Sequence, residues 1–253
     1  MYSQEFNAVT TAARSKTDLL QARPWAYLLA SILAGAFIGF GVILSTTAAV
    51  LTESSGLSRL ASGLTFAGGL SLVVFAGAEL FTGNHFVVGS GILAGRISLT
   101  EGLKVLGVCM LGNWLGAILL SVLFAATGLA DGAAGFIANS AQAKMSLPII
   151  ALITRAVLCN ILVCLAVWCT FRLKSETAKL IMIFWCLFIF ITAGFEHSVA
   201  NMTLLTSAML GPFKDGLSLG GYFYNIFLSS LGNLLGGIWG VALPYYLISR
   251  GKN

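Results

Sequence analysis

The residues that could do chemistry in this 253-residue chain lie in two short segments inside apolar sequence. The segment Gly194–Asn201 contains Glu196 beside His197, one of the two histidines in the chain. The segment Gly77–Asn84 carries glycine, glutamate and asparagine at matching positions. A charged side chain near the centre of a membrane costs at least about 2.5–3.5 kcal/mol, which makes it a candidate for function. Since histidine changes its charge near neutral pH, we interpret the two segments as the lining of one pathway for a small anion.

The composition indicates that these two segments belong to a membrane protein. The chain is 58% hydrophobic and 9% charged, with a mean hydropathy of +0.93. Soluble domains carry about 25% charged residues, so this chain has too little polar surface to cover a soluble globule. A membrane-spanning helix needs about 20 mostly apolar residues. The stretches that meet this length are 26–51, 60–94, 103–127, 149–171, 177–209 and 223–248.

Several classes of protein are not indicated. The five cysteines all fall inside predicted spans, with no Cys-x-x-Cys motif and no cysteine–histidine cluster. Buried free cysteine behaves as a small apolar residue, so we predict no metal and no cofactor. The net charge of +5 is explained by orientation in the membrane rather than by a nucleic-acid partner.

The distribution of basic residues predicts the orientation of the chain. Lysines and arginines concentrate on one side of the predicted spans, whereas the other side carries only Arg59, Lys144 and Lys214. The positive-inside rule then places both termini in the cytoplasm. Residues 1–25 mix apolar and charged side chains, which predicts an amphipathic helix along the cytoplasmic interface. This helix is either a simple anchor or a lid over a pore mouth, and residues 26–249 form a channel domain.

The two halves of the chain repeat. The Gly-Glu-Asn pattern recurs after 117 residues, and Leu111–Ile118 matches Leu231–Ile238 after 120 residues. Because each copy has three spans, the second enters the membrane from the opposite side, which gives an inverted 3+3 repeat over about 26–127 and 149–249. Such folds place their site near the midplane, often where helices are broken. We therefore expect an all-α membrane protein with six transmembrane helices, of which the second and fifth are broken.

Three motifs in order resemble those of the formate/nitrite transporter family. They are Ala76–Asn84, Cys159–Trp168 and Gly194–Met202, and the resemblance covers essentially the whole chain. It implies an aquaporin-like fold, assembly as a homopentamer with one pore per protomer, and a multi-pass protein of the prokaryotic inner membrane. The run from His197 to Leu204 looks closest to the nitrite branch, formate is the next substrate, and hydrosulfide stays open.

The resemblance also implies roles for individual residues along one pore. His197 is the central pore histidine, Thr82 is its partner on the loop that breaks the second span, and Asn160 lies close by. Lys144 resembles a lysine that draws anions into the periplasmic vestibule. The resemblance also implies two constrictions of the pore. The cytoplasmic one consists of Leu80, Phe81 and Val163, and the periplasmic one consists of Phe66, Leu70 and Phe190.

The polar residues of the two breaks divide into a titratable one and a set of supports. An anion paired with a proton at His197 could leave as a neutral acid and avoid most of the cost of crossing the apolar constrictions. A buried structural histidine that bonds a glutamate or an asparagine is the alternative. A bare carboxylate would repel an anion, so we expect the glutamates to accept hydrogen bonds from backbone groups freed by the breaks. The expected scaffold of the breaks is Glu79, Glu196, Asn84 and Asn201.

Two other functional classes remain as alternatives to a channel for small monovalent anions. One is a channel for neutral solutes such as water, glycerol or ammonia. The other is a membrane enzyme that uses Glu196 and His197 as an acid–base pair. Motifs for a nucleophile or a set of metal ligands are lacking in the sequence, so we predict that the chain is not an enzyme.

Overall fold

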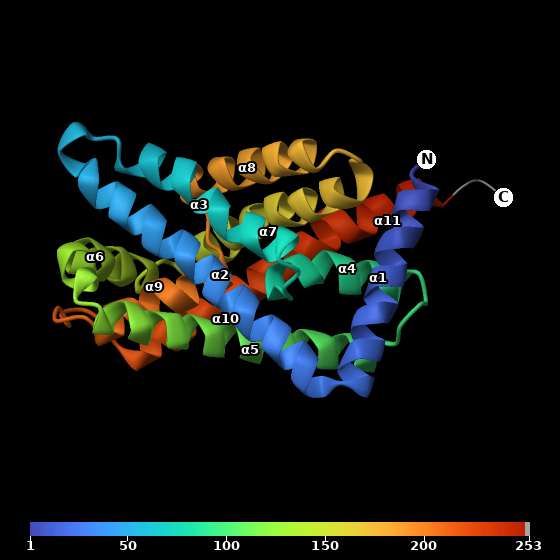
Figure 1. Ribbon diagram of the computed structural model, residues 1–253, viewed down its shortest axis with the longest axis horizontal. Helices are drawn as coiled ribbons and strands as arrows, with labels where there is room; N and C mark the ends of the chain where they lie inside the picture. Colours follow the sequence, from blue (N-terminus) through green and yellow to red (C-terminus); the bar gives the residue numbers. More distant parts are fainter. Residues whose placement is uncertain (251–253) are drawn as a thin grey trace.

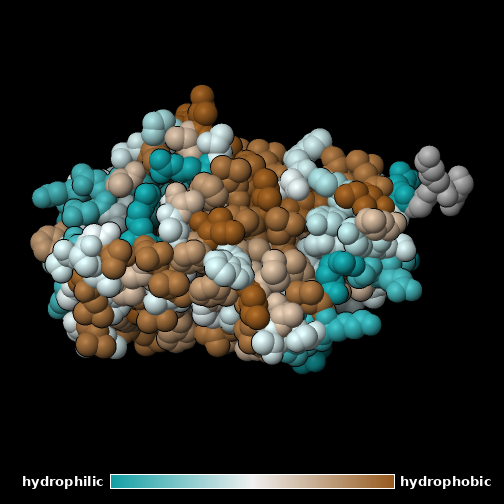
Figure 2. Space-filling view, turned by 90° about the horizontal axis from the view of Figure 1, so that it is seen from above, coloured by the Kyte–Doolittle hydropathy of each residue, from teal (hydrophilic) through white to brown (hydrophobic). Residues whose placement is uncertain are grey.

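The computed structural model describes residues 1–250 as a bundle of helices that contains the expected six candidate membrane spans. Four spans are long: α2 (Pro24–Leu51), α5 (Leu99–Ala126), α7 (Ile149–Arg172), and α10 (Leu219–Gly237) with its continuation to Ser249. The other two spans are α3 (Ser58–Phe75) and α8 (Glu176–Ala193). Figure 2 shows one face of the molecule, on which apolar side chains cover the middle and hydrophilic side chains gather toward both ends.

The second and fifth apolar stretches are broken, as the sequence predicts. After α3 the chain leaves the helix and resumes as the half-length helix α4 (Phe81–Leu93), and after α8 it resumes as α9 (Ser198–Leu210). Every residue of α4 from Phe81 to Gly91 is buried, and so is every residue of α9 from Ser198 to Leu205. The two half-helices therefore form the centre of the bundle, where unwound backbone is shielded by protein.

The long spans pack in matching pairs, α2 against α5 and α7 against α10. A Cβ atom at Gly116 would lie 2.0 Å from the carbonyl oxygen of Ile32, and one at Gly236 would lie 2.3 Å from that of Val157. These glycines let the helix backbones touch, which is the usual role of small residues between membrane helices. The same close approach in both halves agrees with the predicted inverted repeat.

Two further helices complete the bundle. Helix α1 (Ser3–Ala22) crosses one end of the bundle and contacts α11 (Leu243–Ser249) there (Figure 1). Helix α6 (Ala134–Met145) lies between the two repeats and packs on α9; it has no counterpart among the expected elements. Short turns η1 (Glu53–Ser55) and η2 (Leu129–Ala133) join neighbouring helices.

The last span contains a π-helical turn, η3 (Ile238–Ala242), between α10 and α11. Pro244 follows this turn and has no backbone N–H to donate to the preceding turn. A single wide turn in a long helix frequently marks a functional region. Here η3 packs directly on the buried half-helix α4.

Candidate functional site

The two breaks have the same backbone geometry. Gly77 has a φ of 76° and Gly194 a φ of 80°, values at which a side chain is strained. In each break the amide that follows the glycine donates to a carbonyl five residues earlier: Ala78 to Val73, and Phe195 to Phe190, both at 2.9 Å. The spans α3 and α8 therefore end in the same way, and after each of them the chain turns back toward the centre of the bundle.

A single asparagine from a neighbouring span holds each break open. The Oδ1 atom of Asn113 accepts the N–H of Phe81 at 2.8 Å, and its Nδ2 donates to the carbonyl of Glu79 at 2.8 Å and to that of Ser31 at 2.7 Å. Asn233 makes the three equivalent bonds in the second break at 2.8 to 2.9 Å. These amides satisfy the buried backbone groups that a broken helix frees, which would otherwise cost about 1–3 kcal/mol each.

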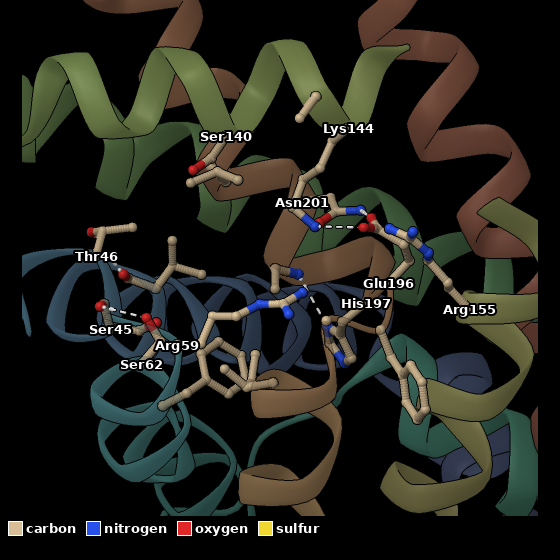
Figure 3. Close-up of a pocket in the computed structure, with 18 of the residues that line it drawn as sticks. Ser45, Thr46, Arg59, Ser62, Ser140, Lys144, Arg155, Glu196, His197 and Asn201 are labelled. Carbon is tan, nitrogen blue, oxygen red and sulfur yellow. Dashed lines mark hydrogen bonds and ion pairs between the residues drawn. The ribbon is translucent and has the colours of Figure 1, made fainter. Parts of the chain in front are cut away.

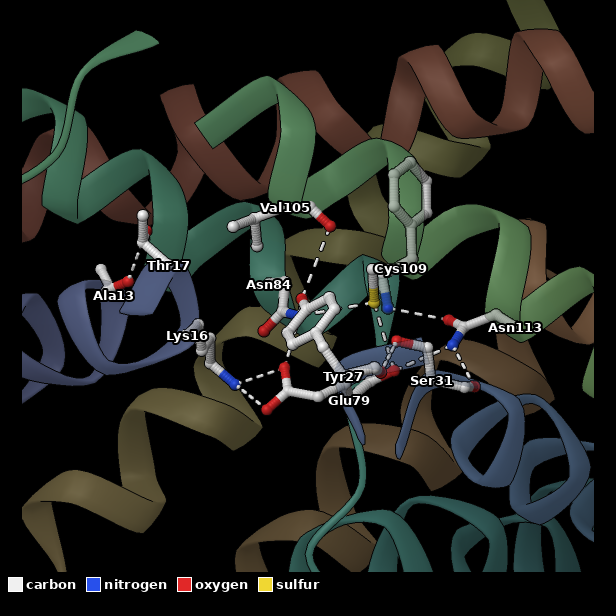
Figure 4. A network of polar contacts seen from close by, with 11 residues as sticks. Ala13, Lys16, Thr17, Tyr27, Ser31, Glu79, Asn84, Val105, Cys109 and Asn113 are labelled. Carbon is white, nitrogen blue, oxygen red and sulfur yellow. Dashed lines mark hydrogen bonds and ion pairs between the residues drawn. The ribbon is translucent and has the colours of Figure 1, made fainter. Parts of the chain in front are cut away.

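Each break glutamate is held by a lysine and an asparagine. Both carboxylate oxygens of Glu79 accept from Lys16 Nζ at 2.6 Å, and one also accepts from Asn84 Nδ2 at 2.9 Å (Figure 4). Glu196 accepts from Lys144 at 2.8 Å and from Asn201 at 2.7 Å. The carboxylates thus bind side chains, whereas the sequence led us to expect backbone donors; Asn113 and Asn233 take that part.

His197 and Thr82, from different repeats, meet in the centre of the bundle. Their Nε2 and Oγ1 atoms are 2.9 Å apart, and both residues are buried. The other ring nitrogen, Nδ1, accepts the backbone N–H of Ala200 at 3.0 Å and so caps the first turn of α9. Because Nδ1 accepts this bond it carries no proton, which assigns the proton of the neutral ring to Nε2, directed at Thr82. The ring of His197 also stacks on Phe190, with centroids 5.8 Å apart.

An apolar cavity adjoins His197 and is too narrow for a water-sized sphere. It brings together all the constriction candidates except Phe81. Its lining is Ile38, Phe66, Leu70, Leu80, Val163, Leu187, Phe190 and His197. The ring of Phe81 packs instead edge-on against His85, with centroids 4.3 Å apart.

Asn160 lies behind Thr82 and lines neither this cavity nor the vestibule described below. Its Nδ2 atom donates to the carbonyls of Thr82 at 3.2 Å and Asn233 at 2.6 Å, and it lies 3.0 Å from Nδ1 of His85. Asn160 therefore ties the first half-helix to the asparagine that holds the second break.

A wider cavity of about 350 Å³, which we call the vestibule, leads from one end of the bundle to His197 (Figure 3). Its wall includes the serines and threonines Ser45, Thr46, Ser58, Ser62 and Ser140. Three basic residues, Arg59, Lys144 and Arg155, also line it, and among residues 1–250 Glu196 is the one carboxylate in its wall. The vestibule is therefore net positive where it approaches the histidine, although Lys144 itself is paired with Glu196.

Helix α1 covers the opposite end of the bundle. Its Phe6, Val9 and Ala13 are buried, and it packs on α4. Three ion pairs fasten it: Lys16 with Glu79 in the first break, Glu5 with Arg172 at 2.7 Å, and Arg14 with Glu101 of α5 at 3.4 Å. The pKa of Glu5 lies below its ordinary value, chiefly because its own backbone amide donates to the carboxylate and also because Arg172 is adjacent.

Sequence reasoning missed several of these residues, although some signals were present. Asn113 and Asn233 stand in the repeated Leu-Gly-Asn segments, so the repeat marked them without revealing their task. Lys16 lies 63 residues from Glu79, and only the fold brings them together.

The fold and the site define a class: a membrane transport protein with six spans, in which two half-helices meet at a narrow central passage. Comparison with known proteins makes this specific. The sequence profile of the formate/nitrite transporter family matches residues 3–247. The nitrite transporter NirC of Salmonella typhimurium is 36% identical over 248 residues, which cover 97% of this chain and 91% of the relative.

Solved structures agree with the profile. An FNT family ion channel superposes with a TM-score of 0.93 at 35% identity, over 98% of this chain and 99% of the other. A pentameric formate channel with formate bound superposes with a TM-score of 0.75 at 28% identity, over 88% and 96%. The chain belongs to the formate/nitrite transporter family, as its three motifs predict.

Proposed function

We propose that the protein is a channel for a small monovalent anion of a weak acid, nitrite or formate. The observation that carries the proposal is the Thr82–His197 contact, which lies between a net positive vestibule and a dry apolar cavity. A neutral-solute channel would gain nothing from a basic vestibule. The relatives support this substrate class, because one is a nitrite transporter and another holds formate.

The dry cavity explains why a proton is useful. An ionised carboxylate without a partner is very costly to place in an apolar environment, whereas a neutral acid keeps only the smaller cost of a polar group. The vestibule and the apolar cavity share Phe66 and His197 in their walls, so an anion that arrives from the vestibule reaches His197 at the entrance of the cavity. In this proposal His197 takes a second proton at Nδ1 from the aqueous solution of the vestibule and gives its Nε2 proton to the anion. The neutral acid crosses the passage lined by Phe66, Leu70 and Leu80, and the ring exchanges its remaining Nδ1 proton for one at Nε2 before it caps α9 again.

The capping bond of His197 limits when this transfer is possible. An imidazolium carries protons on both ring nitrogens, so its Nδ1 cannot accept the N–H of Ala200. Positive charge is also unfavourable at the N-terminus of a helix, where the dipole is positive. The ring that caps α9 is therefore the resting, neutral form, and protonation of His197 requires the Ala200 bond to open.

The remaining site residues take supporting roles in this proposal. Leu80 and Val163 form the cytoplasmic side of the constriction, with Phe81 packed behind it, and Phe66, Leu70 and Phe190 form the periplasmic side. Asn160 positions Thr82 by donating a hydrogen bond to the backbone carbonyl of Thr82. Lys144 contributes charge to the periplasmic vestibule while it supports Glu196. Helix α1 closes the cytoplasmic end, since its buried face and its Lys16–Glu79 pair fasten it over the first break.

We also propose that the chain works as a homopentamer in the prokaryotic inner membrane, with both termini in the cytoplasm. The pentameric relative supports the assembly. The scarcity of basic residues on one side of the spans supports the orientation, because positive residues favour the cytoplasm.

Flux in reconstituted liposomes tests the function. Purified protein should carry nitrite or formate at a rate well above protein-free liposomes, while glycerol and water flux stay at the background. A side-by-side measurement with hydrosulfide identifies the preferred anion. If neither nitrite nor formate crosses faster than in protein-free liposomes, the proposed function is wrong.

A further inference from the structure

The side chains of two arginines in the vestibule have no task in the scaffold. Arg59 extends from α3 and Arg155 from α7, on either side of the second break. The Nη2 atom of Arg59 lies only 2.6 Å from the position that a Cβ atom at Gly194 would occupy, so the guanidinium lies directly over this glycine. The carbonyl of Arg155 accepts the N–H of Glu196 at 3.4 Å, which fixes its backbone beside the same break. Both side chains point into the vestibule, that of Arg59 toward His197 (Figure 3).

Neither guanidinium is neutralised by the protein. Within residues 1–250, Arg59 and Arg155 form no ion pair, and their side chains donate no hydrogen bond to a protein acceptor. The one carboxylate in the wall, Glu196, is already engaged by Lys144 and Asn201. Two sets of guanidinium N–H donors therefore face a cavity in which the only carboxylate from the described part of the chain is already bound.

The chemistry of these donors selects a kind of ligand. A guanidinium is planar and presents paired N–H groups whose spacing matches two oxygen atoms of one planar anion, whereas an ammonium is a point charge. We propose that Arg59 and Arg155 form a capture site for planar monovalent anions with two oxygens, one step before His197. The inference rests on the proposed function and deepens it, because nitrite and formate have this shape while chloride and hydrosulfide do not.

The exposure of both arginines suits a site on a transport path. Both are exposed and line the vestibule, so water that enters the vestibule competes for the donors and keeps the binding weak, as at other exposed charge pairs. A captured anion is then free to move on to His197. Their charge also raises the local concentration of anions at the entrance.

The test is nitrite and formate uptake into liposomes as a function of concentration, with wild type, the double variant Arg59→Lys/Arg155→Lys, and Arg96→Lys as a matched control. Arg96 is an exposed arginine in the loop after α4, outside the vestibule. Lysine keeps the charge and removes the fork. We expect the half-saturating concentration of both anions to rise on the order of tenfold in the double variant, with the maximal rate unchanged. Arg96→Lys should match wild type.

Three results would overturn the inference. One is a double variant with the wild-type half-saturating concentration. Another is a loss of maximal rate alone, which would mean that the arginines only support the fold of the break. The third is competition by chloride as strong as that by formate in wild-type protein. Failure of the proposed function is distinguishable, because wild-type protein itself would then carry neither nitrite nor formate.

Discussion

The first and second breaks share one scaffold and differ in what they present to the pore. In both, a glycine at positive φ, an asparagine from a neighbouring span and a lysine-paired glutamate hold the unwound backbone. The residue after the glutamate is Leu80 in one and His197 in the other, and the side chain of Leu80 makes no capping bond to α4. The comparison shows that a broken helix needs the same supporting residues in both repeats. The residue after the glutamate is not one of these supports, so it can differ and can take a chemical role.

The largest effect is expected from variants that remove the supports shared by both breaks. Asn113→Leu and Asn233→Leu each remove three hydrogen bonds from buried backbone groups. At about 1–3 kcal/mol for each unsatisfied group, either variant should lose several kcal/mol of stability or fail to assemble. Thermal unfolding of the purified protein in detergent measures this. If the scaffold is equivalent in both repeats, the two losses should agree closely; a strong loss in only one variant would contradict the equivalence.

The next prediction compares how much the two glutamates of the breaks contribute to stability. The side chain of Glu196 is 3% exposed and that of Glu79 14%, although each pairs with a lysine. Removing one partner of a buried ion pair costs about 3–5 kcal/mol, and less where water screens the remaining charge. Glu196→Gln should therefore lower the unfolding temperature more than Glu79→Gln. Glu176→Gln, in the exposed Glu176–Lys179 pair, is the control and should change little.

These two expectations separate what the sequence could predict from what it could not. Apolar length and the repeated Gly-Glu-Asn pattern predicted six spans and two breaks, because both are encoded locally. Helix α6 was missed because it is short and lies outside the stretches long enough to cross a membrane. The partners of the glutamates were missed because Lys16 and Lys144 lie 63 and 52 residues away and are joined to them only by the fold.

The residues of the site also divide into those that the sequence could predict and those that it could not. The meeting of Thr82 with His197 followed from the family resemblance, which assigns both to the pore. The cap that His197 makes on α9 was not expected, since it depends on ring orientation. The position of Phe81 behind the cavity also depends on packing, because a residue at the start of a buried helix can face either the pore or its neighbours.

The third effect tests the residue that distinguishes the breaks. His197→Ala removes both the cap and the titratable group, while His197→Asn keeps a side-chain acceptor suited to an N-cap. The alanine variant should lose about 1 kcal/mol of stability, and the asparagine variant less. If His197 supplies the proton, both variants should alter the dependence of nitrite flux on pH between about 5 and 8. A wild-type profile in the asparagine variant would exclude the proton relay and leave a capping role.

The smallest difference in stability is expected at the glycines of the two breaks. Gly77→Ala and Gly194→Ala both place a side chain at positive φ, which costs about 1–2 kcal/mol in each case. The surroundings differ: a Cβ at Gly77 meets nothing within 4 Å, whereas one at Gly194 meets the guanidinium of Arg59. Because that guanidinium is the end of a flexible side chain, it can swing away at little cost in stability.

The two glycine variants should therefore unfold at similar temperatures and yet differ in transport. Only Gly194→Ala displaces Arg59 from the second break, so only this variant should raise the half-saturating concentration of nitrite. Uptake curves for both variants, measured beside their unfolding temperatures, decide the point. Equal uptake curves would mean that the position of Arg59 over Gly194 has no part in anion capture, and that the glycines serve only the backbone in both breaks.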